Sequence, residues 1–255
     1  MILGTATLYL TWIVGRPLSL LVGRREAWRC VVFKCWGRWM ARVLGMRVEV
    51  EGRPPRPPFV LVSNHLSYVD IVLISSRLGC VFLSKAEVGD WPVVGLLARS
   101  MGTLFIRRDH KRDVPVVIEQ IDRCLRRGQG VVVFPEATST NGETVIPFRS
   151  SMLQPAARGG LPVHYAVLTY ATSPQESPAQ LSVCWWGDMT FGRHALDLLK
   201  LSGFQARLIF GEEPIQSDDR KTLAENLHRA VLARFIPVTS APAQEMEKEC
   251  VQENS

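Results

Sequence analysis

A short polar run after an apolar segment carries the residues best suited to chemistry in this chain. The run is Asn64-His65-Leu66-Ser67-Tyr68-Val69-Asp70, and it follows residues 59–63, whose apolar side chains predict a buried strand. A histidine oriented by a carboxylate can act as a general base. On a continuous helix His65 and Asp70 would be about 140° apart. They can meet if His65 lies in a turn and Asp70 in the first turn of the next helix.

The same residues also fit a purely structural role. Ser67 and Asp70 have the spacing of a helix capping box, with Asp in place of Glu or Gln. Under this interpretation Asp70 stabilises the start of a helix, and His65 only fills the turn before it. The spacing alone leaves the catalytic and the structural interpretations open.

Two further polar runs follow predicted strands. Residues 102–109, Gly-Thr-Leu-Phe-Ile-Arg-Arg-Asp, are a strand that leads into paired arginines, and residues 131–139 are a strand that ends in Pro-Glu-Ala-Thr-Ser. Open α/β sheets bind ligands beyond the carboxyl ends of their strands. Each run alone could be an ordinary strand exit, but three such runs together predict a site at one edge of a sheet.

Strands and helices alternate around these runs. Strands are predicted at residues 59–63, 79–84, 102–106, 130–134, 161–169, 181–186 and 205–210, and helices at 68–78, 114–127 and 223–235. This alternation is typical of an α/β fold whose sheet is covered on both faces. We therefore expect a mixed, largely parallel sheet flanked by helices.

The first 45 residues predict a pair of helices that docks on a membrane. Residues 2–14 are apolar, but they lack the charged start and the cleavage site of a signal peptide. Gly15-Arg16-Pro17 is expected to interrupt them before they reach the roughly 20 residues that a membrane span needs. Residues 24–44 predict a helix with tryptophans and a basic stripe, as interfacial helices have. The stripe comprises Arg25, Arg29, Lys34, Arg38 and Arg42.

The net charge of +6 is concentrated at the N-terminus. Residues 1–58 hold ten Arg or Lys against three Glu, whereas residues 240–255 hold one Lys and four Glu. A basic segment can bind nucleic acid or an anionic membrane surface. Because this one lies beside tryptophans, we expect the membrane surface and no nucleic acid. The basic helix could instead pack on the domain with its charges in solvent, and residues 1–22 could cross the bilayer or only dip into it.

Composition divides the chain into three parts. Hydrophobic residues at 47% and charged residues at 21% match a globular protein and exclude a mainly disordered one. We expect a membrane-associated helical hairpin at residues 1–45, an α/β domain at 46–238, and an acidic tail at 239–255 that is flexible. A proline-rich stretch, residues 53–58, follows the hairpin.

Several common motifs are absent from the sequence. There is no G-x-S-x-G elbow, no G-x-x-x-x-G-K-[ST] loop and no complete G-x-G-x-x-G. The five histidines lack metal-ligand spacing, so we expect neither a metal nor a nucleotide cofactor. The six cysteines form no C-x-x-C pair, which favours free thiols in a reducing compartment.

The three polar runs carry a resemblance to a known family. The motifs are N-H-x-x-x-x-D at residues 64–70, G-x-x-F-I-x-R at 102–108 and F-P-E-[GA]-T at 134–138. In order and spacing they resemble the glycerophospholipid acyltransferase family over about residues 59–166. The resemblance implies an O-acyltransferase of the 1-acylglycerol-3-phosphate type. It would move a fatty acyl group from acyl-CoA or acyl-carrier protein to lysophosphatidic acid, giving phosphatidic acid.

The resemblance also implies roles for individual residues and a location. His65 and Asp70 match the family's catalytic dyad. The location implied is the cytoplasmic face of the inner membrane, with no cofactor beyond the acyl donor. Residues that match substrate-binding positions, or lie beside them, are Asn64, Lys85, Arg107, Arg108, Glu136, Ala137 and Thr138.

Two departures from the family pattern leave the acceptor open. Ala137 stands where the family usually has Gly, so a backbone angle that Gly tolerates must suit a residue with a Cβ. Ser139 stands where Arg or Lys is frequent, which removes one cation from the expected phosphate site. Lysophosphatidylcholine or a lyso-ornithine lipid could be the acceptor instead. A thioesterase or lipase that uses water, and a non-catalytic lipid-binding protein, also stay open.

Overall fold

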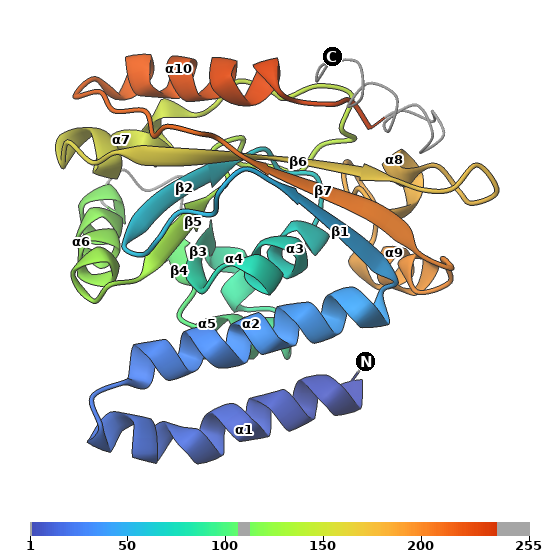
Figure 1. The fold of residues 1–255 in the computed structure, drawn as a ribbon, viewed down its shortest axis with the longest axis horizontal. Helices are drawn as coiled ribbons and strands as arrows, with labels where there is room; N and C mark the ends of the chain where they lie inside the picture. Colours follow the sequence, from blue (N-terminus) through green and yellow to red (C-terminus); the bar gives the residue numbers. More distant parts are fainter. Residues whose placement is uncertain (1, 107–112, 239–255) are drawn as a thin grey trace.

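A seven-stranded sheet forms the centre of the molecule (Figure 1). The computed structural model of the chain describes residues 2–106 and 113–238. The order of strands across the sheet is β1-β7-β6-β2-β5-β3-β4. The strands are β1 (Met46–Glu51), β2 (Phe59–Ser63), β3 (Cys80–Lys85), β4 (Leu104–Ile106), β5 (Gly130–Val133), β6 (Val163–Ala171) and β7 (Phe204–Phe210).

The sheet is mixed and largely parallel, as the sequence predicts. Every neighbouring pair of strands is parallel except β6 and β7, where Val167 lies opposite Ile209 in an antiparallel ladder. The central strands β2, β5 and β3 run in one direction, so their carboxyl ends lie at one edge. This edge is where the polar runs after β2 and β5 emerge.

Helices cover both faces of the sheet (Figure 1). Alternate residues of β2 serve two cores: Leu61 packs into the cluster with α2 and α3, and Val62 into the cluster on the opposite face. The first face carries α2 (Arg25–Val43), α3 (Val69–Arg77), α8 (Ala179–Ser182) and α9 (Phe191–Leu198), and the second carries α6 (Asp113–Arg126), α7 (Ser150–Arg158) and α10 (Arg220–Ala233); α4 (Ala86–Gly89) and α5 (Val94–Ser100) follow β3.

The strands differ from the prediction in two places. Residues 181–186 do not form a strand: α8 begins after Pro178, and the chain then runs as a loop whose Trp185 N–H donates to the Leu66 carbonyl oxygen at 2.9 Å. The apolar side chains there are buried because the loop packs on the domain. Strand β1 was not predicted, although its charged and apolar residues alternate as they do in a strand with one face covered, here at an edge of the sheet.

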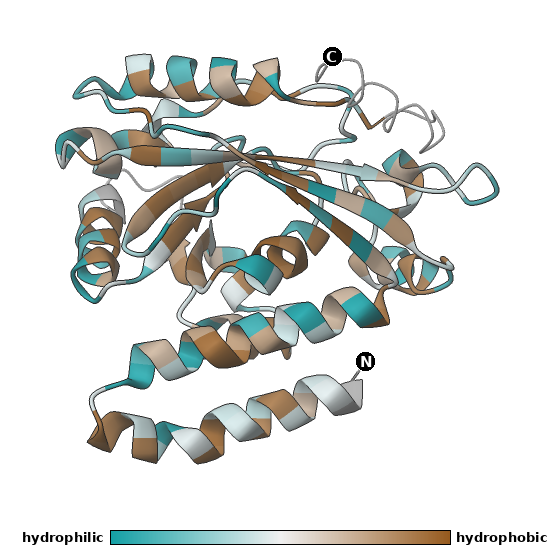
Figure 2. Cartoon of the chain, in the orientation of Figure 1, coloured by the Kyte–Doolittle hydropathy of each residue, from teal (hydrophilic) through white to brown (hydrophobic). Residues whose placement is uncertain are grey.

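The N-terminal pair of helices is present, and α2 lies between α1 (Ile2–Leu21) and the rest of the domain. The expected interruption near Pro17 is wrong, because α1 continues through it. Figure 2 shows apolar and neutral residues over most of α1, whereas hydrophilic residues alternate with apolar ones along α2. No helix within the described ranges is long and apolar enough to cross a membrane.

Helix α2 approaches α3 closely at Gly37. A Cβ at this position would lie 2.6 Å from the backbone nitrogen of Ser76 and 2.8 Å from the carbonyl carbon of Ser75. Backbone atoms cannot move aside as flexible side chains can, so only a residue without a Cβ permits this contact. Gly37 therefore sets how close the N-terminal hairpin lies to the helix that carries Asp70.

We expect Gly37→Ala to destabilise the protein. The added methyl group must push α2 away from α3, and overpacking of this kind costs about 1–3 kcal/mol. Thermal unfolding in mild detergent would show the loss as a lower Tm. Gly192→Ala is the matched control, because Gly192 lies in α9 with open space around it. Equal Tm values for the two variants would contradict the close approach.

Candidate active site

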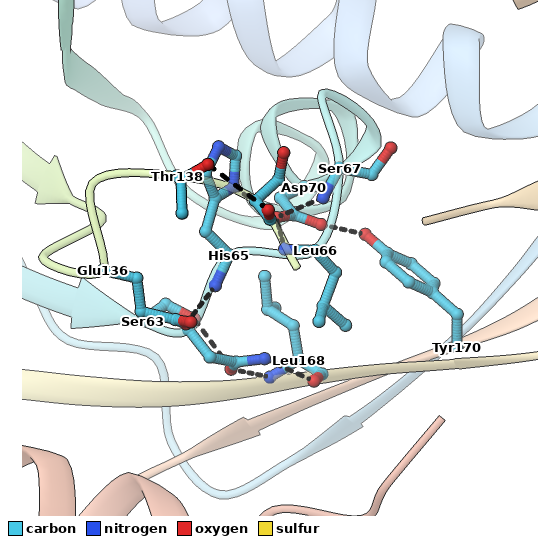
Figure 3. A network of polar contacts seen from close by, with 11 residues as sticks. Ser63, His65, Leu66, Ser67, Asp70, Glu136, Thr138, Leu168 and Tyr170 are labelled. Atoms are coloured by element: carbon cyan, nitrogen blue, oxygen red, sulfur yellow. Dashed lines mark hydrogen bonds and ion pairs between the residues drawn. The ribbon is translucent and has the colours of Figure 1, made fainter. Parts of the chain in front are cut away.

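The turn between β2 and α3 brings His65 and Asp70 into contact (Figure 3). His65 follows the last residue of β2 by two positions, and Asp70 is the second residue of α3. The distance from His65 Nδ1 to Asp70 Oδ2 is 2.7 Å. This is the arrangement that the sequence requires for the pair to meet, with one residue in a turn and the other in the first turn of a helix.

The Asp70 carboxylate is completely buried and accepts four hydrogen bonds. Oδ2 accepts from His65 Nδ1 and from the backbone N–H groups of Leu66 and Ser67, at 2.8 and 3.1 Å. Oδ1 accepts from the Tyr170 hydroxyl at 2.6 Å. The bond to Ser67 is the one that the capping-box interpretation predicts. Asp70 thus holds both the helix start and the histidine, and the two interpretations of its spacing are compatible.

The imidazole of His65 is oriented so that Nδ1 contacts Asp70 and Nε2 lies on the opposite side of the ring. Because Asp70 accepts at Nδ1, the proton lies on Nδ1 and the lone pair on Nε2. The ring also stacks on Phe134, with centroids 4.2 Å apart, which restricts its rotation. The side chain is 22% exposed, so the imidazole is only partly buried. A neutral imidazole in this state can accept a proton from a hydroxyl group.

Glu136 supports the backbone of His65 rather than pointing into solvent. Its Oε1 accepts the His65 N–H at 2.7 Å, and its Oε2 accepts the Ile146 N–H at 3.3 Å. Burial raises the pKa of this carboxyl to about 8, although the two hydrogen bonds lower it. The His65 carbonyl oxygen accepts from the Thr140 N–H at 3.0 Å. The segment that follows β5, through Glu136 and Thr140, therefore bonds both the N–H and the carbonyl oxygen of His65.

Asn64 is turned into the sheet. Its Nδ2 donates to the Leu168 carbonyl oxygen at 2.9 Å, and its Oδ1 accepts the Leu168 N–H at 2.8 Å. The amide is buried and extends the pairing of β2 with β6 by one residue. This geometry makes Asn64 a positioning residue for the turn. It does not support the substrate contact predicted for it.

Ala137 has the backbone conformation that its family position suggests. Its φ is +66°, in the left-handed region that glycine adopts most easily, and its side chain is buried. Lys85, at the end of β3, and Thr138, after Ala137, are exposed. Arg107 and Arg108 lie outside the described residues. Substrate binding by these residues stays a prediction.

Tyr170 is a site residue that the sequence analysis missed. It lies in β6, beyond the three motifs, and only its hydroxyl distinguishes it from the apolar residues around it. Burial and the neighbouring Asp70 raise its pKa well above the usual value, so it stays a hydrogen-bond donor. Among the described residues, no group of three or more His, Cys, Asp or Glu is placed to hold a metal ion.

The fold is similar to that of a solved structure. It matches the crystal structure of the 1-acyl-sn-glycerophosphate (LPA) acyltransferase PlsC from Thermotoga maritima with a TM-score of 0.60. The match covers 90% of this chain and 94% of that chain at 21% identity. At this identity the likeness establishes the architecture alone.

Sequence relatives define the family. Residues 47–168 match a family model described as Acyltransferase. The chain is 35% identical to the lyso-ornithine lipid O-acyltransferase of Pseudomonas aeruginosa, over 81% of this chain and 80% of that protein. It is 30% identical to the 1-acyl-sn-glycerol-3-phosphate acyltransferase of Neisseria meningitidis serogroup B, over 77% of this chain and 78% of that protein. The chain belongs to the glycerophospholipid acyltransferase family.

We expect Tyr170→Phe to lower kcat for acyl transfer by about ten- to a hundred-fold, since a slightly misplaced catalytic group costs rates of this order. The variant keeps the ring but leaves Asp70 Oδ1 without its donor. KM for the acceptor should change little, because the side chain of Tyr170 is fully buried. Tyr165→Phe, in the same strand but packed on the opposite face, is the control. A rise in KM with unchanged kcat would contradict this role.

Glu136 should make the stability of the protein depend on pH. A carboxyl with a pKa of about 8 when folded and 4.5 when unfolded binds its proton more tightly in the folded state. Its contribution is therefore fully present below the unfolded pKa and is lost as the pH rises toward 8. The loss approaches about 1.4 kcal/mol per pH unit within this window.

Urea unfolding at several pH values, on the wild type and on Glu136→Gln, measures this effect. The amide does not titrate, so the free energy of unfolding of the variant should fall less steeply between about pH 5 and 8. Parallel pH profiles for the two proteins would show that Glu136 is ionised in the folded state.

Proposed function

We propose that the protein transfers a fatty acyl group from an acyl thioester to the free hydroxyl of a lyso-lipid, with His65 as general base and Asp70 as the group that orients it. The observation that carries the proposal is the 2.7 Å contact of His65 Nδ1 with a buried, fully hydrogen-bonded carboxylate. It leaves Nε2 as a proton acceptor on a side chain that is 22% exposed. Membership of the acyltransferase family supports the same chemistry.

The reaction needs a base but no enzyme nucleophile. Nε2 takes the proton of the acceptor hydroxyl while the oxygen attacks the thioester carbonyl carbon. The tetrahedral intermediate then collapses, the carbon–sulfur bond breaks, and the leaving thiolate takes the proton from the imidazolium. Asp70 stabilises the imidazolium between these steps, since its negative charge lies against Nδ1. The donor thiol belongs to coenzyme A or to acyl-carrier protein.

A lyso-ornithine lipid is the acceptor that we propose first. Lyso-ornithine lipid O-acyltransferases of two organisms are 35% and 31% identical to this chain over 81% and 86% of its length. Ser139, in place of a cation, also favours an acceptor without a phosphate. Lysophosphatidic acid is the second candidate. It is favoured by the Neisseria relative and by exposed Lys85 at the same sheet edge.

The helical hairpin would hold the enzyme on the cytoplasmic surface of the membrane. One side of α1 packs on α2, with Trp12 and Ser19 buried. Arg16 in α1 is exposed, and so are seven apolar residues that lie along α1 from residue 10 onward and in the turn after it. They are Leu10, Ile13, Val14, Leu18, Leu20, Leu21 and Val22. An apolar helix surface of this kind enters the interface of one leaflet, where lyso-lipids lie.

The test is acyl transfer by purified, detergent-solubilised protein from radiolabelled oleoyl-CoA to a panel of lyso-lipids. We expect His65→Ala to lower the rate by about 10²–10⁴, the usual contribution of a general base. His164→Ala is the control, because His164 lies in β6 away from the site. Near-wild-type turnover in His65→Ala would exclude the proposed base.

The panel distinguishes the alternatives. Product from lyso-ornithine lipid supports the proposed acceptor. Product only from lysophosphatidic acid would make that lipid the acceptor and leave the proposed mechanism unchanged. Free fatty acid released without any acceptor would favour a thioesterase or lipase. If folded protein gives no product with oleoyl-CoA or with acyl-carrier protein donors, a non-catalytic lipid-binding role is favoured.

A further inference from the structure

A small basic pocket lies where α2, the end of α3 and β1 meet. Its volume is about 170 Å³, and its lining includes Arg38, Arg42 and Arg77 beside Ser76 and Val48. Arg38 and Arg42 lie one turn apart on α2, and Arg77 is the last residue of α3. The fold therefore collects three guanidinium groups from two helices around one small space.

These guanidinium groups have no carboxylate partner within residues 2–106 and 113–238. Arg38 Nε donates to the Ser76 carbonyl oxygen at 3.3 Å, and an Arg77 Nη donates to the Val48 carbonyl oxygen at 3.4 Å. Arg77 Nε is buried and has no hydrogen-bond partner in the same ranges. In contrast, Arg207 and Arg234 both pair with Glu51. The pocket thus has donors to offer to a ligand.

The cations of the pocket also repel one another. Burial lowers the pKa of Arg77, and the charge of Arg38 lowers it further. Lys34, one turn before Arg38 on α2, has its pKa lowered by burial and by the same two arginines. An anion with several oxygen atoms would relieve this repulsion and accept from the free N–H groups. Arginine forks match the geometry of a phosphate group.

The position of the pocket indicates where the anion comes from. Helix α1 presents the apolar surface that we propose enters the leaflet, and α2 packs directly above it (Figure 1). Packed helices lie about 8–10 Å apart, which is close to the depth that an interfacial helix buries. Cations on the side of α2 then lie at the level of the lipid headgroups.

We propose that this pocket binds the phosphate group of an anionic phospholipid in the leaflet on which the hairpin docks. The pocket is separate from the acyl-transfer site, because Arg77 and Asp70 lie at opposite ends of α3, about 10 Å apart along its axis. The proposal rests on the membrane docking put forward above. It does not depend on the identity of the acyl acceptor.

The test compares vesicle binding of full-length variants without an acyl donor. Arg38→Gln/Arg77→Gln keeps polar side chains but removes two charges from the pocket. Arg24→Gln/Arg25→Gln removes two charges at the other end of α2, where neither arginine has a described carboxylate partner. Each variant is mixed with phosphatidylcholine vesicles, with or without phosphatidylglycerol. Thermal unfolding first checks that it folds.

Salt separates pocket binding from general attraction. At about 1 M salt the Debye length falls to about 3 Å, so exposed charges are screened while partly buried contacts persist. We expect the control variant to bind phosphatidylglycerol vesicles like the wild type under these conditions. The pocket variant should bind at least about ten-fold more weakly, the effect of losing a hydrogen bond to a charged group. Neither variant should change binding to phosphatidylcholine alone.

Three results would overturn the proposal. Equal binding of both double variants in high salt means that the charges act only as a diffuse surface. Protection of the wild type against thermal unfolding by inorganic phosphate, together with unchanged vesicle binding of the pocket variant, means that the ligand is a soluble phosphate. If the wild type binds no vesicle, the proposed membrane docking is wrong. Acyl transfer by the wild type in detergent tests the catalytic proposal separately. If the Arg77→Gln change prevents folding, Arg38→Gln/Arg42→Gln replaces the pocket variant, because both of these residues also line the pocket.

Discussion

The buried carboxylate of Asp70 is the group on which the site and much of the fold depend. A fully desolvated charge is costly unless its oxygen atoms are hydrogen-bonded. Here the donors come from the turn after β2, from the histidine and from β6. Strand, turn and helix must all be in place before the carboxylate is satisfied. The contact between His65 and Asp70 therefore results from the hydrogen bonds that a buried carboxylate requires.

Much of this arrangement could be predicted from local sequence. Apolar runs gave the central strands to within a few residues, because a strand covered on both faces must be apolar at every position. The spacing of His65 and Asp70 allowed a contact through a turn before a helix, and the family resemblance predicted the pair, which the structure places 2.7 Å apart. Ala137 was expected to need an unusual backbone angle, and its φ is +66°. Each of these properties is set within a few residues of chain.

Other features depend on partners far along the chain and could not be predicted in the same way. Tyr170 is 100 residues from Asp70, and nothing in its local sequence indicates which carboxylate it meets. Residues 181–186 have the apolar pattern of a strand, but they are buried as a loop over the turn at Leu66. The amide of Asn64 is polar and lies beside the histidine, yet it hydrogen-bonds to the backbone of Leu168 in β6. Burial and hydrogen bonding by distant segments decided these cases.

The position of Tyr170 shows that the segment with the three motifs, residues 47–168, depends on residues that follow it in the chain. All three motifs and the family match end by residue 168, but the strand that completes the carboxylate's surroundings continues to Ala171 and pairs with β7. A fragment that stopped at residue 168 would contain every motif residue. It would lack Tyr170, so Asp70 Oδ1 would lose its hydrogen-bond donor. Grafting the motifs onto another scaffold would meet the same difficulty. The smallest autonomous unit of this enzyme is accordingly larger than the segment by which it is recognised.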